Sequence, residues 1–130
     1  MQLDTKQKVL VAIYIEYQKD IPDMGKNIKS NILGIDAEVF VNAISKLMNE
    51  EYITEVDILR GGIGGKIQSI ILRDMMITRD GIEYVETKIG IDKTLNGIEK
   101  VKYISKKAVE AGWDKGTDIA AKVLAELIKS

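Results

Sequence analysis

Apolar residues near the start of the chain recur at spacings of three and four, the period of one face of an α-helix. This stripe predicts a helix over residues 4–19, with the Asp4 side chain placed to cap its N-terminus. Pro22 disfavours helical geometry in Ile21, so the helix is expected to end just before it. The apolar positions of this stripe are Val9, Leu10, Ile13, Tyr14 and Tyr17.

Two further helical segments are expected before residue 52. Residues 24–33 predict a short helix that is stopped by Gly34. A third helix is predicted to begin at a cap formed by Asp36 and to end near residues 49–51. Its apolar stripe consists of Val39, Phe40, Ala43, Ile44, Leu47 and Met48.

The pattern then changes from a helical to a strand period. Residues 52–58 are rich in β-forming side chains and alternate at Val56 and Ile58, and residues 67–73 form a second β-rich run. Between them, residues 61–66 contain four glycines. We therefore predict an antiparallel hairpin with the glycines at its tip.

From Thr78 onward the sequence predicts helices. Thr78 or Asp80 can cap a helix that carries Ile82 and Val85 on one side. Apolar stripes predict one helix over residues 91–111 and another from about residue 117 to the end. The apolar stripe of the first of these consists of Ile91, Leu95, Ile98, Val101, Ile104 and Ala108.

Composition excludes several kinds of chemistry. The 130 residues include no cysteine and no histidine, so disulfides, thiolate catalysis and histidine general bases are ruled out. The 19 basic and 20 acidic residues give a formal charge of −1, which provides no long-range attraction to nucleic acid or to anionic membranes. No apolar run approaches a membrane span, and the first residues lack the pattern of a signal peptide, so we expect a cytoplasmic protein with no membrane partner.

No motif predicts catalysis, a metal site or a cofactor. Residues 61–66 fail the phosphate-loop spacing, because Arg60 and Ile67 occupy positions that require glycine and Ser/Thr. The tyrosines are expected at the edge of the core with their hydroxyls in water. The chain is therefore not expected to be an enzyme. The carboxylates expected on a solvated face are Asp74, Asp80, Glu83 and Glu86.

The order of these elements is that of a winged helix-turn-helix domain followed by a helical extension, an α+β fold. Residues 40–53 resemble a recognition helix that leads into the first strand of a wing, and residues 77–84 are similar to the L-T-x-x-G step of MarR-like and PadR-like regulators. Residues 1–89 as a whole resemble the YjcQ-like family of small winged-helix proteins from Gram-positive bacteria and their prophages. The resemblance implies a winged-helix domain over residues 1–90, an extension over residues 91–130, and a transcription-regulatory, phage-related role.

Such a domain would bind double-stranded DNA through its second and third helices and the hairpin tip. Lysines and arginine supply phosphate contacts, and small polar side chains on the outer face of the third helix read base edges. Against this, residues 36–51 hold four acids and a single lysine, so use of the scaffold for protein–protein contact remains the alternative. The candidate DNA-binding residues are Lys26, Lys29, Asn42, Ser45, Lys46, Asn49, Arg60 and Lys66.

The C-terminal extension predicts a dimer. Its last helix carries a continuous apolar face that must be buried against some surface. Winged-helix regulators commonly pair through such terminal helices, although a hairpin folded back onto residues 91–111 would also cover the face. The candidate interface residues are Trp113, Ile119, Val123, Leu124, Leu127 and Ile128.

Overall fold

The structure is a computed structural model that describes residues 3–110. Within this range the protein is a mixed α+β fold of helices and two small antiparallel sheets. The elements are α1 (Thr5–Tyr17), α2 (Met24–Asn27), α3 (Ser30–Leu33), α4 (Ala37–Asn49), β1 (Ile53–Thr54), β2 (Asp57–Gly61), β3 (Lys66–Ile71), β4 (Met76–Ile77), α5 (Arg79–Ile89) and α6 (Gly97–Glu110).

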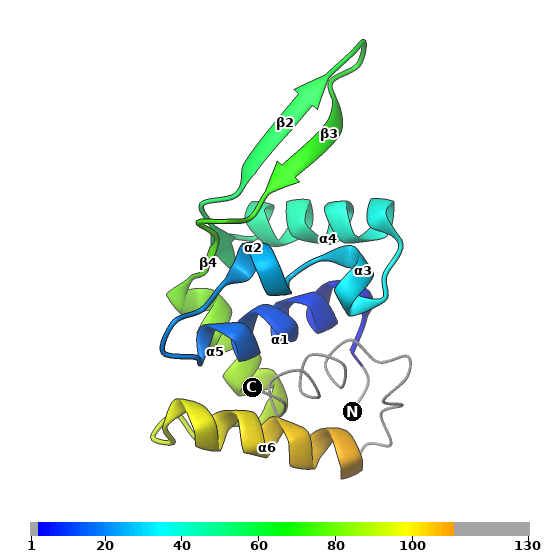
Figure 1. Cartoon of the computed structure of the whole chain (residues 1–130). Helices are drawn as coiled ribbons and strands as arrows, with labels where there is room; N and C mark the ends of the chain where they lie inside the picture. The colour runs from blue at the N-terminus through cyan, green and yellow to red at the C-terminus, as the bar shows by residue number, and fades with distance from the viewer. Residues whose placement is uncertain (1–2, 111–130) are drawn as a thin grey trace.

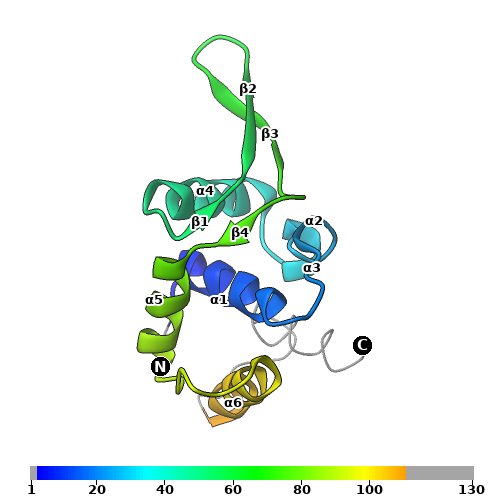
Figure 2. The same ribbon diagram turned by 90° about the vertical axis from the view of Figure 1, so that its left-hand side faces the viewer.

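Helix α1 is the centre of the fold. All residues from Val9 to Glu16 are buried, because α4, α5 and α6 surround this helix on different sides (Figures 1 and 2). Its N-terminus is closed by a capping box, in which Asp4 accepts from the Gln7 backbone and the Gln7 side chain accepts from the Asp4 backbone. The cap predicted at Asp4 is therefore confirmed.

The predicted hairpin is confirmed, but its first strand is shorter than expected. Strands β2 and β3 pair antiparallel from Asp57 opposite Ile71 to Gly61 opposite Lys66, and they project from the body beyond α4 (Figure 1). The prediction of one strand over residues 52–58 was wrong. Glu55 has a φ of 64°, which interrupts the strand, and the preceding β1 pairs with β4 instead.

The start of α5 explains the Thr-x-x-Gly spacing of residues 78–81. The Thr78 hydroxyl accepts from the Gly81 amide at 3.0 Å and donates to the Glu51 carbonyl at 2.7 Å. A Cβ atom added at Gly81 would collide with the carbonyl oxygen of Tyr52. A cap and a close backbone approach thus fix both positions.

Two carboxylates are buried in the described chain, and one of them was expected in solvent. Glu86 is 4% exposed and accepts from the Tyr14 hydroxyl at 2.8 Å and from Lys100 Nζ at 2.7 Å. The prediction of a solvated Glu86 was wrong, and so was that of a wet hydroxyl on Tyr14, because the fold brings α1, α5 and α6 together at this point. A buried carboxylate requires such partners.

The second buried carboxylate, Glu16, holds the chain that follows α1. It accepts from the Asp23 amide at 2.9 Å and from Asn27 Nδ2 at 3.0 Å, and it pairs with Lys19 Nζ at 3.0 Å. These bonds fix the beginning of α2 against the end of α1. The single helix predicted over residues 24–33 is in fact the two short helices α2 and α3.

Helix α6 packs against the side of α1 that faces away from α4 (Figure 2). It begins at Gly97, later than predicted, and buries Ile104 and Ala108 in the core. Ile98 was expected in the buried stripe but is 69% exposed. None of the described helices is long and apolar enough to cross a membrane. The last predicted helix and the candidate dimer residues 113–128 lie outside the described residues.

Candidate nucleic-acid interface

Helix α4 has one buried and one exposed face, as its sequence predicts. Phe40, Ala43, Ile44 and Leu47 are buried. Asp36 caps the helix by accepting from the amides of Glu38 and Val39, as expected. Three candidate base-reading residues lie on the opposite face of the helix by its period. Asn42 and Asn49 are exposed, and Ser45 is half-buried.

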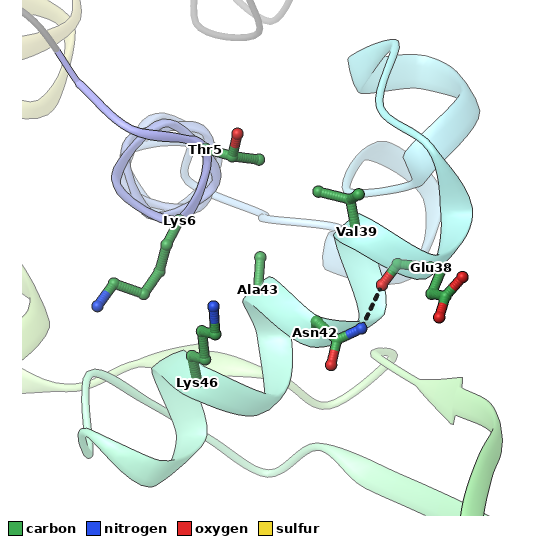
Figure 3. Close-up of a pocket in the computed structure, with 7 residues that line it drawn as sticks. All are labelled: Thr5, Lys6, Glu38, Val39, Asn42, Ala43 and Lys46. Carbon is green, nitrogen blue, oxygen red and sulfur yellow. Dashed lines mark hydrogen bonds between the residues drawn. The ribbon is translucent and has the colours of Figure 1, made fainter.

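Next to this face, an open hollow of about 390 Å³ separates the first turn of α1 from α4 (Figure 3). Lys46 rises from α4 at its edge, and Val39 and Ala43 border it. Asn42 Nδ2 donates to the Glu38 carbonyl at 2.9 Å. This bond uses one of the two Nδ2 hydrogens and fixes the amide, which leaves Oδ1 and the other hydrogen available for pairing with adenine. The residues that line the hollow are Thr5, Lys6, Glu38, Val39, Asn42, Ala43 and Lys46.

The acids around α4 oppose the approach of DNA less than their number suggests. Lys6 Nζ donates to Glu50 Oε2 at 2.9 Å, and this hydrogen bond, opposed by partial burial, raises the pKa of Lys6 above its usual value. The Asp36 carboxylate is occupied as the cap of α4. Only Glu38 and Glu51 remain exposed without these roles. Sequence reasoning missed Lys6, because its pairing depends on how α1 packs against α4.

The tip of the hairpin carries two exposed cations. Lys66 follows the four-residue turn directly and Arg60 precedes it by one residue, and Arg60 Nη1 donates to the Gly65 carbonyl at 3.2 Å. Gly62, Gly64 and Gly65 all have positive φ angles, which glycine adopts without strain. The glycines are therefore explained by the turn, and the two cations stand free of the body of the protein.

The remaining candidates, Lys26 and Lys29, lie in and after α2 and are exposed. Lys29 borders a second hollow of about 300 Å³ between α2, α3, α4 and β3. Neither of these lysines, nor Lys46 or Lys66, makes an ion pair with a residue in the range 3–110. The eight candidates thus fall into three groups, on α2 and the link to α3, on α4, and on the hairpin.

Apolar side chains in the hairpin form a second feature that the sequence reasoning did not single out. Leu59 is 52% exposed, Ile71 is 43% exposed, and Ile63 at the tip is 104% exposed. The sequence predicted the hairpin and its glycine tip but gave no indication of which of its side chains are buried. A hairpin that projects from the body leaves one face and its tip in water.

The described chain is thus an α+β domain with a polar outer helix and a projecting basic hairpin. The family model described as YjcQ protein matches residues 7–104, and the chain belongs to this family. The match extends past residue 89, where the resemblance was expected to end, and includes the first half of α6. Comparison with curated proteins and with solved structures found no match.

Proposed function

We propose that the chain is a winged-helix protein that binds double-stranded DNA as a transcription-regulatory module. In this reading α1, the α2–α3 pair and α4 are the helices of the domain, and the β2–β3 hairpin is its wing. The domain would end near residue 90, with α6 belonging to the extension. The extended chain from β4 into α5 carries the Thr78–Gly81 step that resembles MarR-like and PadR-like regulators.

One observation carries the proposal. The hairpin and α4 lie on the side of α1 opposite to α6, and they carry exposed cations that are not consumed by ion pairs within residues 3–110 (Figure 2). The acids that would oppose DNA at this face are partly occupied, Asp36 by the helix cap and Glu50 by Lys6. Free cations on a projecting hairpin beside a polar helix suit a phosphate backbone.

The residues divide by role. We assign the phosphate contacts to the cations and the base contacts to the polar side chains on the outer face of α4. The side chains of Asn49 and Ser45 make no hydrogen bond within residues 3–110 and can turn toward bases, whereas the Asn42 amide is held by its bond to the Glu38 carbonyl. The cations assigned to phosphates are Lys26, Lys29, Lys46, Arg60 and Lys66.

A titration of duplex DNA at about 50 and 200 mM salt tests the proposal, because each phosphate contact steepens the salt dependence by roughly 0.9 logarithmic units. Lys66→Gln should weaken binding and flatten the slope by about one unit. Lys106→Gln, on the exposed side of α6, is the matched control and should change neither quantity. Negligible binding at low salt to both random DNA and the promoter of the gene itself would refute the proposal.

A specific observation favours the alternative role as a protein-binding scaffold. Leu59 and Ile71 are both about half exposed and lie diagonally on one face of the hairpin by its register, and contiguous exposed apolar patches mark protein contacts. Under this alternative the hairpin binds another protein and the cations at its tip are merely solvated. Absence of DNA binding in the titration would favour it.

We further propose that the protein is a cytoplasmic homodimer that binds DNA and does not catalyse a reaction. Dimerisation is assigned to the apolar face of residues 119–128 and to Trp113, all outside the described range. A two-fold dimer would present two copies of α4 and of the hairpin to successive turns of a duplex.

A further inference from the structure

Ile63 is the most exposed large apolar side chain in the described chain, and it stands at the apex of the β2–β3 hairpin. Its exposed fraction is 104%, so the entire side chain is in water. Gly62 precedes it and Gly64 and Gly65 follow it, and a Cβ atom added at any of the three would contact nothing within 4 Å. The apex is therefore a single aliphatic group on a backbone that carries no other side chain.

This apex is narrow and has a cationic side chain on each side. Two paired strands have axes about 4.8 Å apart, so the hairpin with its atomic radii is wider than the roughly 6 Å minor groove of B-DNA. Only the apex side chain would therefore enter the groove, which widens as the DNA bends. A turn whose other residues are glycines adds no side-chain width to that backbone. Arg60 and Lys66 stand on either side of the turn, where they would meet the phosphates that border a groove.

The length of the hairpin suits this position. From Asp57 to Gly62 the chain makes five residue steps, which at about 3.3 Å each span roughly 17 Å. Half a helical turn of DNA, the distance from the middle of a major groove to the adjacent minor groove, is also about 17 Å. With α4 in the major groove, the apex would reach the next minor groove.

We propose that Ile63 is an apolar wedge that enters the minor groove of duplex DNA, partly unstacks one base step and bends the helix. This inference rests on the proposed DNA binding and adds the mode of contact. Aliphatic wedges act in this way in minor-groove proteins, and they favour flexible pyrimidine–purine steps. The protein would then select its sites partly by how easily the DNA deforms.

The test measures the affinity and the bend of a duplex of roughly 20 base pairs carrying a central TA step, with dyes at both ends to report end-to-end distance by energy transfer. The full-length wild-type protein should shorten that distance. Ile63→Ala should bind about tenfold more weakly and leave the duplex straight, whereas Ile63→Leu should retain the bend. Because Ile63 contacts nothing in the body of the protein, neither substitution should change the thermal midpoint, which serves as the folding control.

Each of the other possible outcomes would refute the proposed wedge. If the wild type binds and Ile63→Ala binds and bends equally well, the wedge is wrong while DNA binding stands. If the wild type does not bind duplex DNA at low salt, both the wedge and the proposed function fail. If Ile63 instead governs binding to vesicles of anionic phospholipid and the duplex is never bent, the tip serves a membrane surface and the wedge is likewise wrong.

Discussion

Loss of the Lys100 ammonium group should destabilise the whole fold, although Lys100 lies on a helix at its periphery. The side chain is 15% exposed and its Nζ lies 2.7 Å from Glu86 Oε2, while Glu86 itself is 4% exposed. Lys100→Met keeps the length of the apolar stem and removes only the charge. Among residues 3–110, the buried Glu86 carboxylate then keeps only the Tyr14 hydroxyl as a partner.

The expected magnitude follows from this geometry. Removal of one partner of a buried ion pair destabilises by about 3–5 kcal/mol, and the residual solvent access of Lys100 places the value near the lower limit, about 3 kcal/mol. Total stabilities of domains are about 5–15 kcal/mol, so the change should lower the thermal midpoint by on the order of 10 °C. Replacing Glu86 by Gln in the same chain removes the buried charge and should recover part of the loss.

Urea unfolding followed by circular dichroism measures these differences in the free energy of unfolding. Lys102→Met is the matched control, because Lys102 is exposed on the same helix and should contribute less than about 0.5 kcal/mol. A double-mutant cycle of Glu86→Gln and Lys100→Met gives the coupling between the two side chains. If Lys100→Met is no more destabilising than Lys102→Met, the ion pair contributes nothing and the reasoning is wrong.

Three further predictions concern backbone fit, titration and assembly. Gly81→Ala should destabilise by at least about 2 kcal/mol in urea unfolding, because the new Cβ meets the Tyr52 carbonyl, whereas Gly25→Ala should have a much smaller effect. Burial and the hydrogen bond to the Glu86 carboxylate raise the pKa of Tyr14, so stability present below pH 10 should decline as the pH rises above it, less steeply in Tyr14→Phe. Deletion of residues 113–130 should convert a dimer into a folded monomer by light scattering; a monomeric full-length chain with an unfolded truncated form would contradict this.

Local signals in the sequence were sufficient to place most of the elements. Asp4, Asp36 and Thr78 cap α1, α4 and α5, because a cap depends on a side chain and amides only two or three residues away. The glycines of residues 61–66 identified the hairpin for the same reason, since a turn is a local structure.

The failures share a different cause, which is contact between distant parts of the chain. Glu86 is 72 residues from Tyr14 in sequence, and nothing near Glu86 indicates that it is buried. Val39 and Ile98 continue helical apolar stripes but are 45% and 69% exposed, and Val39 borders the open hollow between α1 and α4, which the stripe does not reveal. Glu55 breaks the first strand with a positive φ although no glycine marks the position.

At the candidate interface, the exposure of the residues was predicted correctly, but their side-chain partners were not. The eight residues proposed from the sequence are exposed or half-buried, as a polar face predicts. The Asn42 bond to the Glu38 carbonyl lies within one turn of α4, yet it fixes an amide that sequence reasoning treated as free. The pairing of Lys6 with Glu50 joins α1 to α4 across 44 residues and could not be inferred without the fold.

Net charge is therefore a poor measure of whether this chain can approach a polyanion. Residues 36–51 carry four acids and one lysine, a balance that argues against DNA when it is read as a sum. In the fold, one of these acids caps a helix and another is paired with a lysine from α1, while the hairpin that carries Arg60 and Lys66 projects beyond α4 (Figure 1). Because screening limits the influence of each exposed charge to about 10 Å, the placement of the cations on the projecting hairpin matters more than the total. This is why the salt dependence of Lys66→Gln, rather than the isoelectric point, is the measurement that separates a DNA-binding hairpin from a protein-binding one.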